Sequence, residues 1–269
     1  MDLQLTGRRA LITGGSRGIG LGIARSLAAE GVNLVLIARD DTRLSHVASE
    51  ICSEFNVDVR THSADLYENH AADDIASKHA DVDILVNNAN TPSGGSLESV
   101  SDEQWMHNWS LKPFGYIRMM RAFVPILRAR GGGVIANMIG AIGQLPSNKA
   151  IYSAASCSAL TTITEGLAHD LSNMSIRVLG FNSWVVNTEK NVHAFRERAA
   201  TSLGDAARWP ELHSNLPFKR AAEPSEIGDL LTFCVSPRAA YLSGQVISLD
   251  GGYVASSLPT IAKGALAHE

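Results

Sequence analysis

A short apolar run at residues 10–13 leads into Thr13-Gly14-Gly15-Ser16-Arg17-Gly18-Ile19-Gly20, and from there into residues 20–30, where apolar side chains recur at helical spacing. Glycines at such a junction let the backbone turn tightly and approach a pyrophosphate, which the positive end of the helix dipole attracts. A single glycine-rich loop is weak evidence, because any tight turn can require one or two glycines. Three glycines at these positions inside a strand–helix–strand unit are a stronger indication of a dinucleotide-binding turn.

The pattern around this loop repeats along the chain. Further β-branched or leucine-rich runs occupy residues 33–38, 57–60, 83–87, 133–137, 176–180 and 245–249. Longer stretches with apolar residues at helical spacing, such as residues 153–173, lie between them. Strands that are apolar along their length and alternate with helices imply a parallel sheet covered on both faces. The sequence therefore predicts an α/β fold, a Rossmann-type doubly wound parallel sheet, in a single domain over residues 1–269.

Composition limits the partners and the compartment. The 269 residues are 45% hydrophobic and 19% charged, with a formal net charge of −4. There is no basic run that would indicate nucleic acid or an anionic membrane as a partner. The cysteines Cys52, Cys157 and Cys234 lie far apart, which argues against disulfides or a zinc cluster and for a reducing compartment. No apolar run is long enough for a signal peptide or a membrane span, so we expect a cytoplasmic protein without a metal site.

Several motifs together resemble those of a known family. Besides the TGxxxGxG spacing of the loop, the chain has Asn87-Asn88-Ala89 after the fourth apolar run, Tyr152 after the fifth, and Leu249-Asp250-Gly251-Gly252 near its end. In this combination it resembles the short-chain dehydrogenase/reductase family over residues 5–253. The resemblance implies a nicotinamide dinucleotide, a small-molecule substrate and a homo-oligomer, either tetramer or dimer. The cofactor contacts that it implies are Gly14, Ser16, Arg17, Gly18, Ile19, Gly20, Arg39, Asp65, Leu66, Asn88, Ala89 and Thr188.

The residues after the second apolar run indicate which cofactor is bound. An acidic side chain there would hydrogen-bond a ribose hydroxyl and repel a 2′-phosphate. This chain has Ala38 and Arg39 instead, with Arg17 in the glycine loop, and two guanidinium groups can hold a 2′-phosphate with charge-assisted forked hydrogen bonds. The alternative is that both arginines are solvated and that Asp40 and Asp41 partly neutralise Arg39. We favour NADP(H) over NAD(H).

The catalytic positions that the resemblance implies are altered. In the family, a tyrosine exchanges a proton with the substrate, a lysine four residues later lowers its pKa, and a serine orients the substrate oxygen. Tyr152 is present, but its i+4 neighbour is Ser156 rather than lysine, and the position of the serine holds Gly140. The position of a supporting asparagine holds Lys112. An unassisted tyrosine titrates near ~10 and is a poor base at neutral pH, so these replacements indicate a remodelled active site.

One interpretation keeps hydride transfer. Tyr152 is then the proton donor, and Lys112 supplies the missing cation from the neighbouring helix, close enough to depress the pKa of the phenol. Lys149, one helical turn before Tyr152, is a second candidate, and Ser153 or Ser156 is a candidate for the lost hydroxyl. The alternative for both lysines is that they are solvated surface charges.

Two other interpretations remain open. Where the family has a short Asn-Pro-Gly stretch, this chain has Asn182-Ser183-Trp184, and the bulky indole could fill the space of the nicotinamide. In that case the protein would catalyse a non-redox cyclisation, isomerisation or elimination. In the third interpretation it is an inactive binding or partner protein whose nucleotide site only stabilises the fold. For Trp184, ordinary core packing is the alternative.

Two segments carry no fold signal. Residues 189–216, rich in Arg, Ala and Glu, lie where such folds place a substrate-covering lid, and residues 254–269 form a C-terminal tail. We expect both to be the least ordered parts of the chain. Neither contains a chemical group that identifies the substrate.

Overall fold

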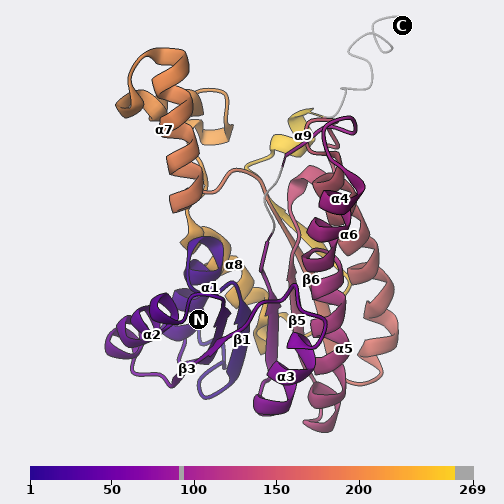
Figure 1. Ribbon diagram of the computed structural model, residues 1–269. Helices are drawn as coiled ribbons and strands as arrows, with labels where there is room; N and C mark the ends of the chain where they lie inside the picture. Colours follow the sequence, from indigo (N-terminus) through magenta and orange to yellow (C-terminus); the bar gives the residue numbers. More distant parts are fainter. Residues whose placement is uncertain (91–93, 258–269) are drawn as a thin grey trace, which may run out of the picture.

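The computed structural model describes residues 1–90 and 94–257 (Figure 1). Seven parallel strands form one sheet in the order β3-β2-β1-β4-β5-β6-β7. The predicted doubly wound α/β fold is confirmed. The strands are β1 (Arg9–Thr13), β2 (Asn33–Ala38), β3 (Val59–Ser63), β4 (Ile84–Asn87), β5 (Gly133–Met138), β6 (Ile176–Ser183) and β7 (Val246–Leu249).

Helices cover both faces of this sheet, and its central strands are therefore buried on both sides. One apolar core joins the sheet to α1, α2 and α8, and a second joins it to α3, α5 and α6. The helices are α1 (Gly18–Ala29), α2 (Asp41–Phe55), α3 (Ala71–Lys78), α4 (Asp102–Leu111), α5 (Phe114–Ala129), α6 (Ile151–Ser172), α7 (Glu189–Leu203), α8 (Pro224–Val235) and α9 (Tyr253–Ser257). Short 3₁₀ helices are η1 (Ala141–Gly143), η2 (Ala206–His213), η3 (Pro217–Lys219) and η4 (Pro237–Ala239). No helix within the described ranges is long and apolar enough to cross a membrane.

The third strand begins later than the sequence predicted. The β-branched valines of residues 57–60 favoured a strand there, but α2 ends at Phe55 with Asn56 as a left-handed cap, and pairing with β2 starts only at Val59. The strand then continues to Ser63 through polar residues. β3 is an edge strand that pairs only with β2, and its side chains are partly exposed, so it tolerates polar residues.

The segment 189–216 is helical, contrary to the expectation of low order. Thr188 caps α7 by accepting a hydrogen bond from the backbone of Asn191, and Gly204 ends the helix in the left-handed conformation. The ring of His213 packs edge-on against Phe195 at 4.6 Å and so ties η2 to α7. In Figure 1, α7 extends away from the sheet. The segment that contains η2 lies at the end of α7 that is farther from α8. Of the predicted tail, Tyr253–Ser257 form α9, and residues 258–269 lie outside the described chain.

Candidate active site

The glycine loop lies at the carboxyl end of β1, and its backbone geometry explains its glycines. Gly14 and Gly18 have φ values of +68° and +55°, a region that favours glycine. At Gly20 a Cβ would overlap the carbonyl oxygen of Gly14, so the start of α1 can pack on the loop only without a side chain. The glycines at positions 14, 18 and 20 are therefore required by the backbone of this turn.

The end of β4 holds this loop in place. The Asn88 side-chain amide donates to the carbonyl oxygens of Thr13 and Gly14 at 2.9 and 3.2 Å, and the backbone amides of Asn88 and Ala89 donate to the Thr13 hydroxyl at 2.8 and 3.1 Å. From the other side, Thr188 lies against Gly18, whose added Cβ would be 3.2 Å from the threonine methyl group. The structure thus gathers Asn88, Ala89 and Thr188 around the glycine loop.

The amino terminus of α1 is open to an anion. Its N-cap residue, Arg17, makes no side-chain capping hydrogen bond, and the first turn contains no acidic residue. The first amides of a helix lack intrahelical acceptors and carry partial positive charge, so they attract phosphate groups. This end of α1 therefore fits the pyrophosphate of a dinucleotide.

The residues that the sequence proposed for a 2′-phosphate, Arg17 and Arg39, are both exposed. Within the described residues, the side chains of Arg17 and Arg39 form no ion pair. The Asp40 carboxylate caps α2 by accepting a hydrogen bond from the backbone of Arg43 at 3.0 Å. The Ser63 hydroxyl donates to the carbonyl oxygen of Arg39 and ties the end of β2 to the end of β3.

Sequence reasoning missed a third arginine here. Arg43, in the first turn of α2, donates through Nε to the carbonyl oxygen of Ser16 at 3.0 Å and through Nη2 to both carboxylate oxygens of Glu189 at 2.7 and 2.9 Å. Ser16 belongs to the glycine loop, and Glu189 is the first residue of α7. The Arg43 side chain therefore links the glycine loop to α7.

The residues predicted to meet adenine lie at the end of β3. Asp65 accepts a hydrogen bond from the backbone of Tyr67 at 3.1 Å, and Leu66 is buried. The Tyr67 ring stacks on His107 with centroids 4.2 Å apart. Burial raises the pKa of the Tyr67 phenol, while the nearby Arg39 guanidinium acts in the opposite direction. Tyr67 therefore lies beside the adenosine end of the proposed site.

Tyr152 lies in the first turn of α6 and is buried, with 3% of its surface exposed. The Trp109 indole N–H donates to the Tyr152 backbone carbonyl at 3.1 Å, and the Trp105 ring packs edge-on against the phenol ring at 6.2 Å. Burial raises the pKa of the Tyr152 phenol, and a hydrogen bond with the Gly94 backbone opposes this in part. The phenol is accordingly protonated at neutral pH.

Lys112 is buried rather than solvated. It caps the end of α4, and its ammonium group donates to the carbonyl oxygens of Met138, at 3.1 Å, and Ile139. Burial lowers the pKa of this ammonium group, and the neighbouring Cys157 opposes that effect. Within the described residues, no contact joins the Lys112 ammonium to the Tyr152 phenol. Lys149, the second candidate cation, is exposed.

At positions 156 and 140, the structure offers no free hydroxyl that could orient a substrate. The Ser156 hydroxyl donates to the carbonyl oxygen of Ser153 in the same helix at 2.8 Å. Gly140, which ends the β5 segment, has a φ of +125°, and its N–H donates to the side-chain oxygen of Asn182 at 3.2 Å. An L-residue at position 140 would be strained, so this backbone is built for glycine.

Trp184 follows β6 and is partly buried. Its ring stacks on Tyr253 with centroids 4.6 Å apart, at an angle of 17°. It forms one wall of a cavity of about 210 Å³ between the ends of β6 and β7 and the segment around η3. Other walls come from Leu216, Phe218, Arg220 and Asp250. Within the described residues no cluster of His, Cys, Asp and Glu could hold a metal ion, and all three cysteines are free.

Comparison with protein families completes this picture. The short chain dehydrogenase family matches residues 8–199, most of the chain. The protein belongs to this family. Galactitol 2-dehydrogenase (L-tagatose-forming) of Cereibacter sphaeroides is 32% identical over 93% of this chain and 96% of its own length. L-xylulose reductase of Bos taurus is 30% identical over 95% of this chain and its full length.

Solved structures of other short-chain dehydrogenases agree with this fold. L-sorbose reductase of Gluconobacter frateurii, in complex with NADPH and L-sorbose, has a TM-score of 0.90 and 32% identity and covers 94% of this chain and 99% of its own. An NADPH-bound short chain oxidoreductase of Pseudomonas aeruginosa PAO1, described as containing an atypical catalytic center, has a TM-score of 0.83 and 26% identity. It covers 92% of this chain and 97% of its own. The family assignment that the motifs suggested is confirmed.

For a short-chain dehydrogenase, this chain has an uneven site. Of the residues expected at the nucleotide end, Asn88, Ala89 and Thr188 contact or lie against the glycine loop. At the other end, the Lys112 ammonium and the Ser156 hydroxyl are both bonded to backbone carbonyls rather than directed at Tyr152. Trp109 adds a contact to the backbone of Tyr152 through its indole N–H.

Proposed function

We propose that this protein is an NADP(H)-dependent oxidoreductase that transfers a hydride to or from a small carbonyl or alcohol substrate, with imines and activated alkenes as related acceptors. The observation that carries the proposal is the buried, protonated Tyr152 phenol at the carboxyl edge of the sheet that also bears the glycine loop. A protonated phenol there suits the donation of a proton to a substrate oxygen. Tyr152 is the proposed catalytic residue.

The residues around the loop fit NADP(H). The close approach of Gly20 to Gly14, which a side chain would prevent, and the uncapped amino end of α1 suit the pyrophosphate. The guanidinium groups of Arg17 and Arg39 suit the 2′-phosphate. When bound, the nicotinamide supplies or accepts the hydride. Asn88, Ala89 and Thr188, the remaining proposed contacts, hold the loop or lie against it.

The raised pKa of Tyr152 keeps the phenol in the protonated form that reduction requires. Because the phenol holds its proton above the ordinary value near ~10, it acts as an acid throughout the physiological range. Reduction uses this acid directly, whereas oxidation of an alcohol requires the phenolate as base. Reduction should therefore lose rate only when the pH rises through the phenol pKa, and oxidation should gain rate over the same interval.

Lys112 serves this site as a positioning residue in our proposal. Its ammonium group holds the carbonyls that end β5, one residue before Gly140, whose N–H is bonded to Asn182. This replaces the direct Lys112–Tyr152 pairing that the sequence suggested. Lys112→Met should disturb the end of β5 and reduce turnover without shifting the pH profile of Tyr152, whereas a direct cationic role predicts an upward shift of the pH optimum.

The substrate class that we propose is a small polyhydroxylated ketone or its polyol. Relatives named for galactitol, L-xylulose and L-sorbose support this class. The cavity beside Trp184 combines an aromatic ring with Arg220, Glu226 and Asp250, a mixture of a flat apolar face and charged hydrogen-bonding groups. Such a mixture suits the C–H face and the hydroxyls of a sugar.

The test begins with binding and continues with turnover. Purified protein is titrated with NADPH and NADH by tryptophan fluorescence, and NADPH oxidation is then followed with L-sorbose, L-xylulose and L-tagatose. We expect selective NADPH binding and oxidation that depends on Tyr152. A folded sample that binds neither nucleotide would refute the oxidoreductase proposal.

One observation favours a different function. The Lys112 ammonium and the Ser156 hydroxyl are both engaged by carbonyl oxygens, so the usual assistance to the tyrosine is missing in this arrangement. A non-redox enzyme, or a nucleotide-binding partner protein without turnover, would tolerate this loss. Either would bind NADPH and leave its absorbance unchanged with every ketone tested.

We also propose that the protein is a homo-oligomer, a dimer or a tetramer. Met106 of α4 and Phe114 of α5 are exposed by 65% and 51%, which is a high exposure for large apolar side chains on adjacent helices. Light scattering coupled to size-exclusion chromatography should give a mass that is a multiple of 28.7 kDa.

A further inference from the structure

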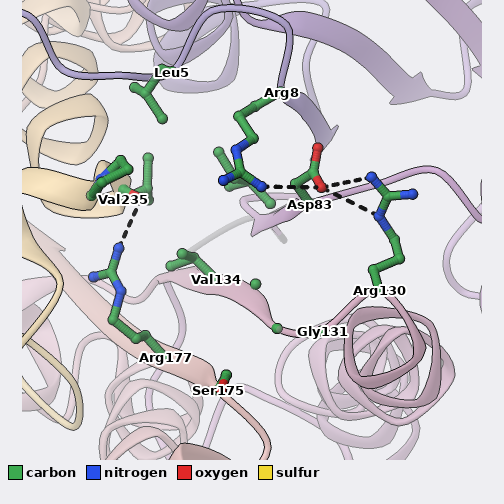
Figure 2. Close-up of a pocket in the computed structure, with 13 residues that line it drawn as sticks. Leu5, Arg8, Asp83, Arg130, Gly131, Val134, Ser175, Arg177 and Val235 are labelled. Atoms are coloured by element: carbon green, nitrogen blue, oxygen red, sulfur yellow. Dashed lines mark hydrogen bonds and ion pairs between the residues drawn. The ribbon is translucent and has the colours of Figure 1, made fainter.

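One cavity of the described chain lies at the edge of the sheet opposite the glycine loop. Its volume is about 240 Å³, and it opens at the amino ends of β1, β4, β5 and β6, the edge of the sheet opposite the cofactor site. Figure 2 shows Arg8 and Arg130 approaching Asp83 from two sides, with Arg177 turned toward Val235. None of these residues takes part in the proposed reaction.

The cavity has an excess of positive charge. Three arginines line it, and Asp83 is the only acid among its 13 described lining residues. Arg177 is already engaged: its two terminal nitrogens donate to carbonyl oxygens at the end of α8, including Val235 at 2.8 Å, where the helix carries partial negative charge. Arg8 and Arg130 therefore share a single carboxylate, although the whole chain is net negative.

The Asp83 carboxylate is largely occupied by other donors and forms no hydrogen bond with Arg8. One carboxylate oxygen accepts the backbone N–H of Arg9 at 2.9 Å, and the other accepts two hydrogen bonds from Arg130 at 2.7 and 3.3 Å. The Arg8 guanidinium is 3.7 Å from that second oxygen, beyond hydrogen-bond distance, and its side chain is 56% exposed. Within residues 1–90 and 94–257 the Arg8 side chain makes no hydrogen bond, so its donors are available.

The remaining walls are apolar. Leu5, Ile84, Val134 and Val235 are buried side chains that line the cavity, and Pro237 adds a further apolar surface. Gly131–Gly133 contribute no side chains, and a Cβ at Gly131 would meet nothing within 4 Å. A ligand would thus place an anionic group at Arg8 and Arg130 and a short hydrocarbon part against these walls.

We propose that this cavity is a second binding site, which takes a small organic monocarboxylate. A guanidinium group can bind a carboxylate through two parallel hydrogen bonds in one plane. Arg130, Asp83 and Arg8 already alternate in charge, and the ligand carboxylate at Arg8 would be the next negative group in this row. A dianion such as phosphate would be repelled by Asp83. The volume is below the roughly 300–1,000 Å³ of pockets for drug-sized ligands, so a nucleotide does not fit.

The test uses hexanoate as the probe and full-length protein saturated with NADPH, so that the arginines of the cofactor site are occupied. Binding is measured by calorimetry and by ligand-observed NMR. We expect hexanoate to bind, 1-hexanol to bind more weakly because it lacks the charge, and inorganic phosphate not to displace hexanoate. Equal binding of hexanol, or displacement by phosphate, would contradict a carboxylate site.

Variants locate the site. Arg8→Gln and Arg130→Gln should each weaken hexanoate binding by about tenfold or more, because each removes charge-assisted hydrogen bonds. Arg128→Gln is the matched control, since Arg128 is an exposed arginine in the last turn of α5, two residues before Arg130, and does not line the cavity. Arg8→Gln removes no hydrogen bond of the described structure, so it remains informative even if Arg130→Gln unfolds.

Two results would overturn the proposal. If the wild-type protein binds no hexanoate, the arginines and Asp83 form only an ion-pair cluster that ties β1 and β4 to the end of α5. If hexanoate binds equally well to wild type and Arg8→Gln, the ligand occupies another part of the molecule. Because the site lies at the opposite edge of the sheet, neither result bears on NADPH binding or turnover.

Discussion

The half of the sheet formed by β1, β2 and β3 and the half formed by β4, β5 and β6 support the proposed site in different ways. In the first half, recognition rests on backbone: glycines that allow a turn, and helix amides that face an anion. In the second half, the proposed chemistry rests on individual side chains, and Gly140 and Ser156 stand where the family resemblance led us to expect a serine and a lysine. The contrast teaches that the two ends of the proposed site must be tested separately.

The largest expected effect tests whether the second half still performs chemistry. Tyr152→Phe should reduce NADPH-dependent turnover by about 10²–10⁴-fold, because the substrate oxygen loses its proton donor. NADPH affinity, followed by tryptophan fluorescence, should remain unchanged. Tyr241→Phe is the control, since Tyr241 is fully exposed. Equal loss in both variants, or no loss in the first, would remove Tyr152 from the mechanism.

A smaller effect tests the first half. Arg39→Gln should raise the Kd for NADPH by about 10–100-fold, since it removes hydrogen bonds from a charged group to the 2′-phosphate. The Kd for NADH, which lacks that phosphate, should barely change. Arg128→Gln should leave both values unaltered. If both cofactors weaken together in Arg39→Gln, the arginine supports the fold of the site rather than recognition of the phosphate.

The third prediction concerns the backbone at the end of β5. Gly140→Ala should destabilise the protein by about 1–3 kcal/mol, because φ is +125° there. Gly166→Ala is the matched control: Gly166 lies inside α6, and an added Cβ meets nothing within 4 Å, so this variant should be neutral or slightly stabilising. Thermal unfolding measures both. For the same reason Gly140→Ser with Ser156→Lys should not restore a family-like site.

The smallest effect concerns the link between the two halves. Glu189→Gln breaks the ion pair with Arg43 and should cost at most about 1 kcal/mol of global stability, because the pair is largely exposed. Its local effect is easier to detect, as hydrogen exchange in the first turn of α7 should become faster. Glu197→Gln, in the same helix but bonded only to His193, is the control. Unchanged exchange would mean that Arg43 does not hold the lid helix.

The difference between the halves also explains what the sequence could predict. Gly14, Gly18 and Gly20 were predictable because a required backbone conformation leaves a visible trace in residue type. Arg43 was missed, since its partner Glu189 is 146 residues away and no local pattern joins them. The position of Lys112 on its helix was identified, but the direction of its ammonium group depends on the carbonyls of a distant strand.

Trp184 shows the same limit. The sequence offered two roles for its indole, and the stacking of its ring on Tyr253, which follows β7, was visible in no local pattern. The strand count and the order of elements could be predicted because apolar periodicity is local. The start of β3 could not, since it depends on where α2 ends and on which residue of β2 pairs with Val59.

The bridge from Ser16 through Arg43 to Glu189 has a consequence for the kinetics. The same arginine contacts the glycine loop, which we propose receives the cofactor, and the first turn of α7, the proposed lid. If both proposals hold, nucleotide binding would affect α7 before any substrate is present. We expect a compulsory order in the steady state, with NADPH entering first and NADP⁺ leaving last, and product-inhibition patterns will show whether that order holds.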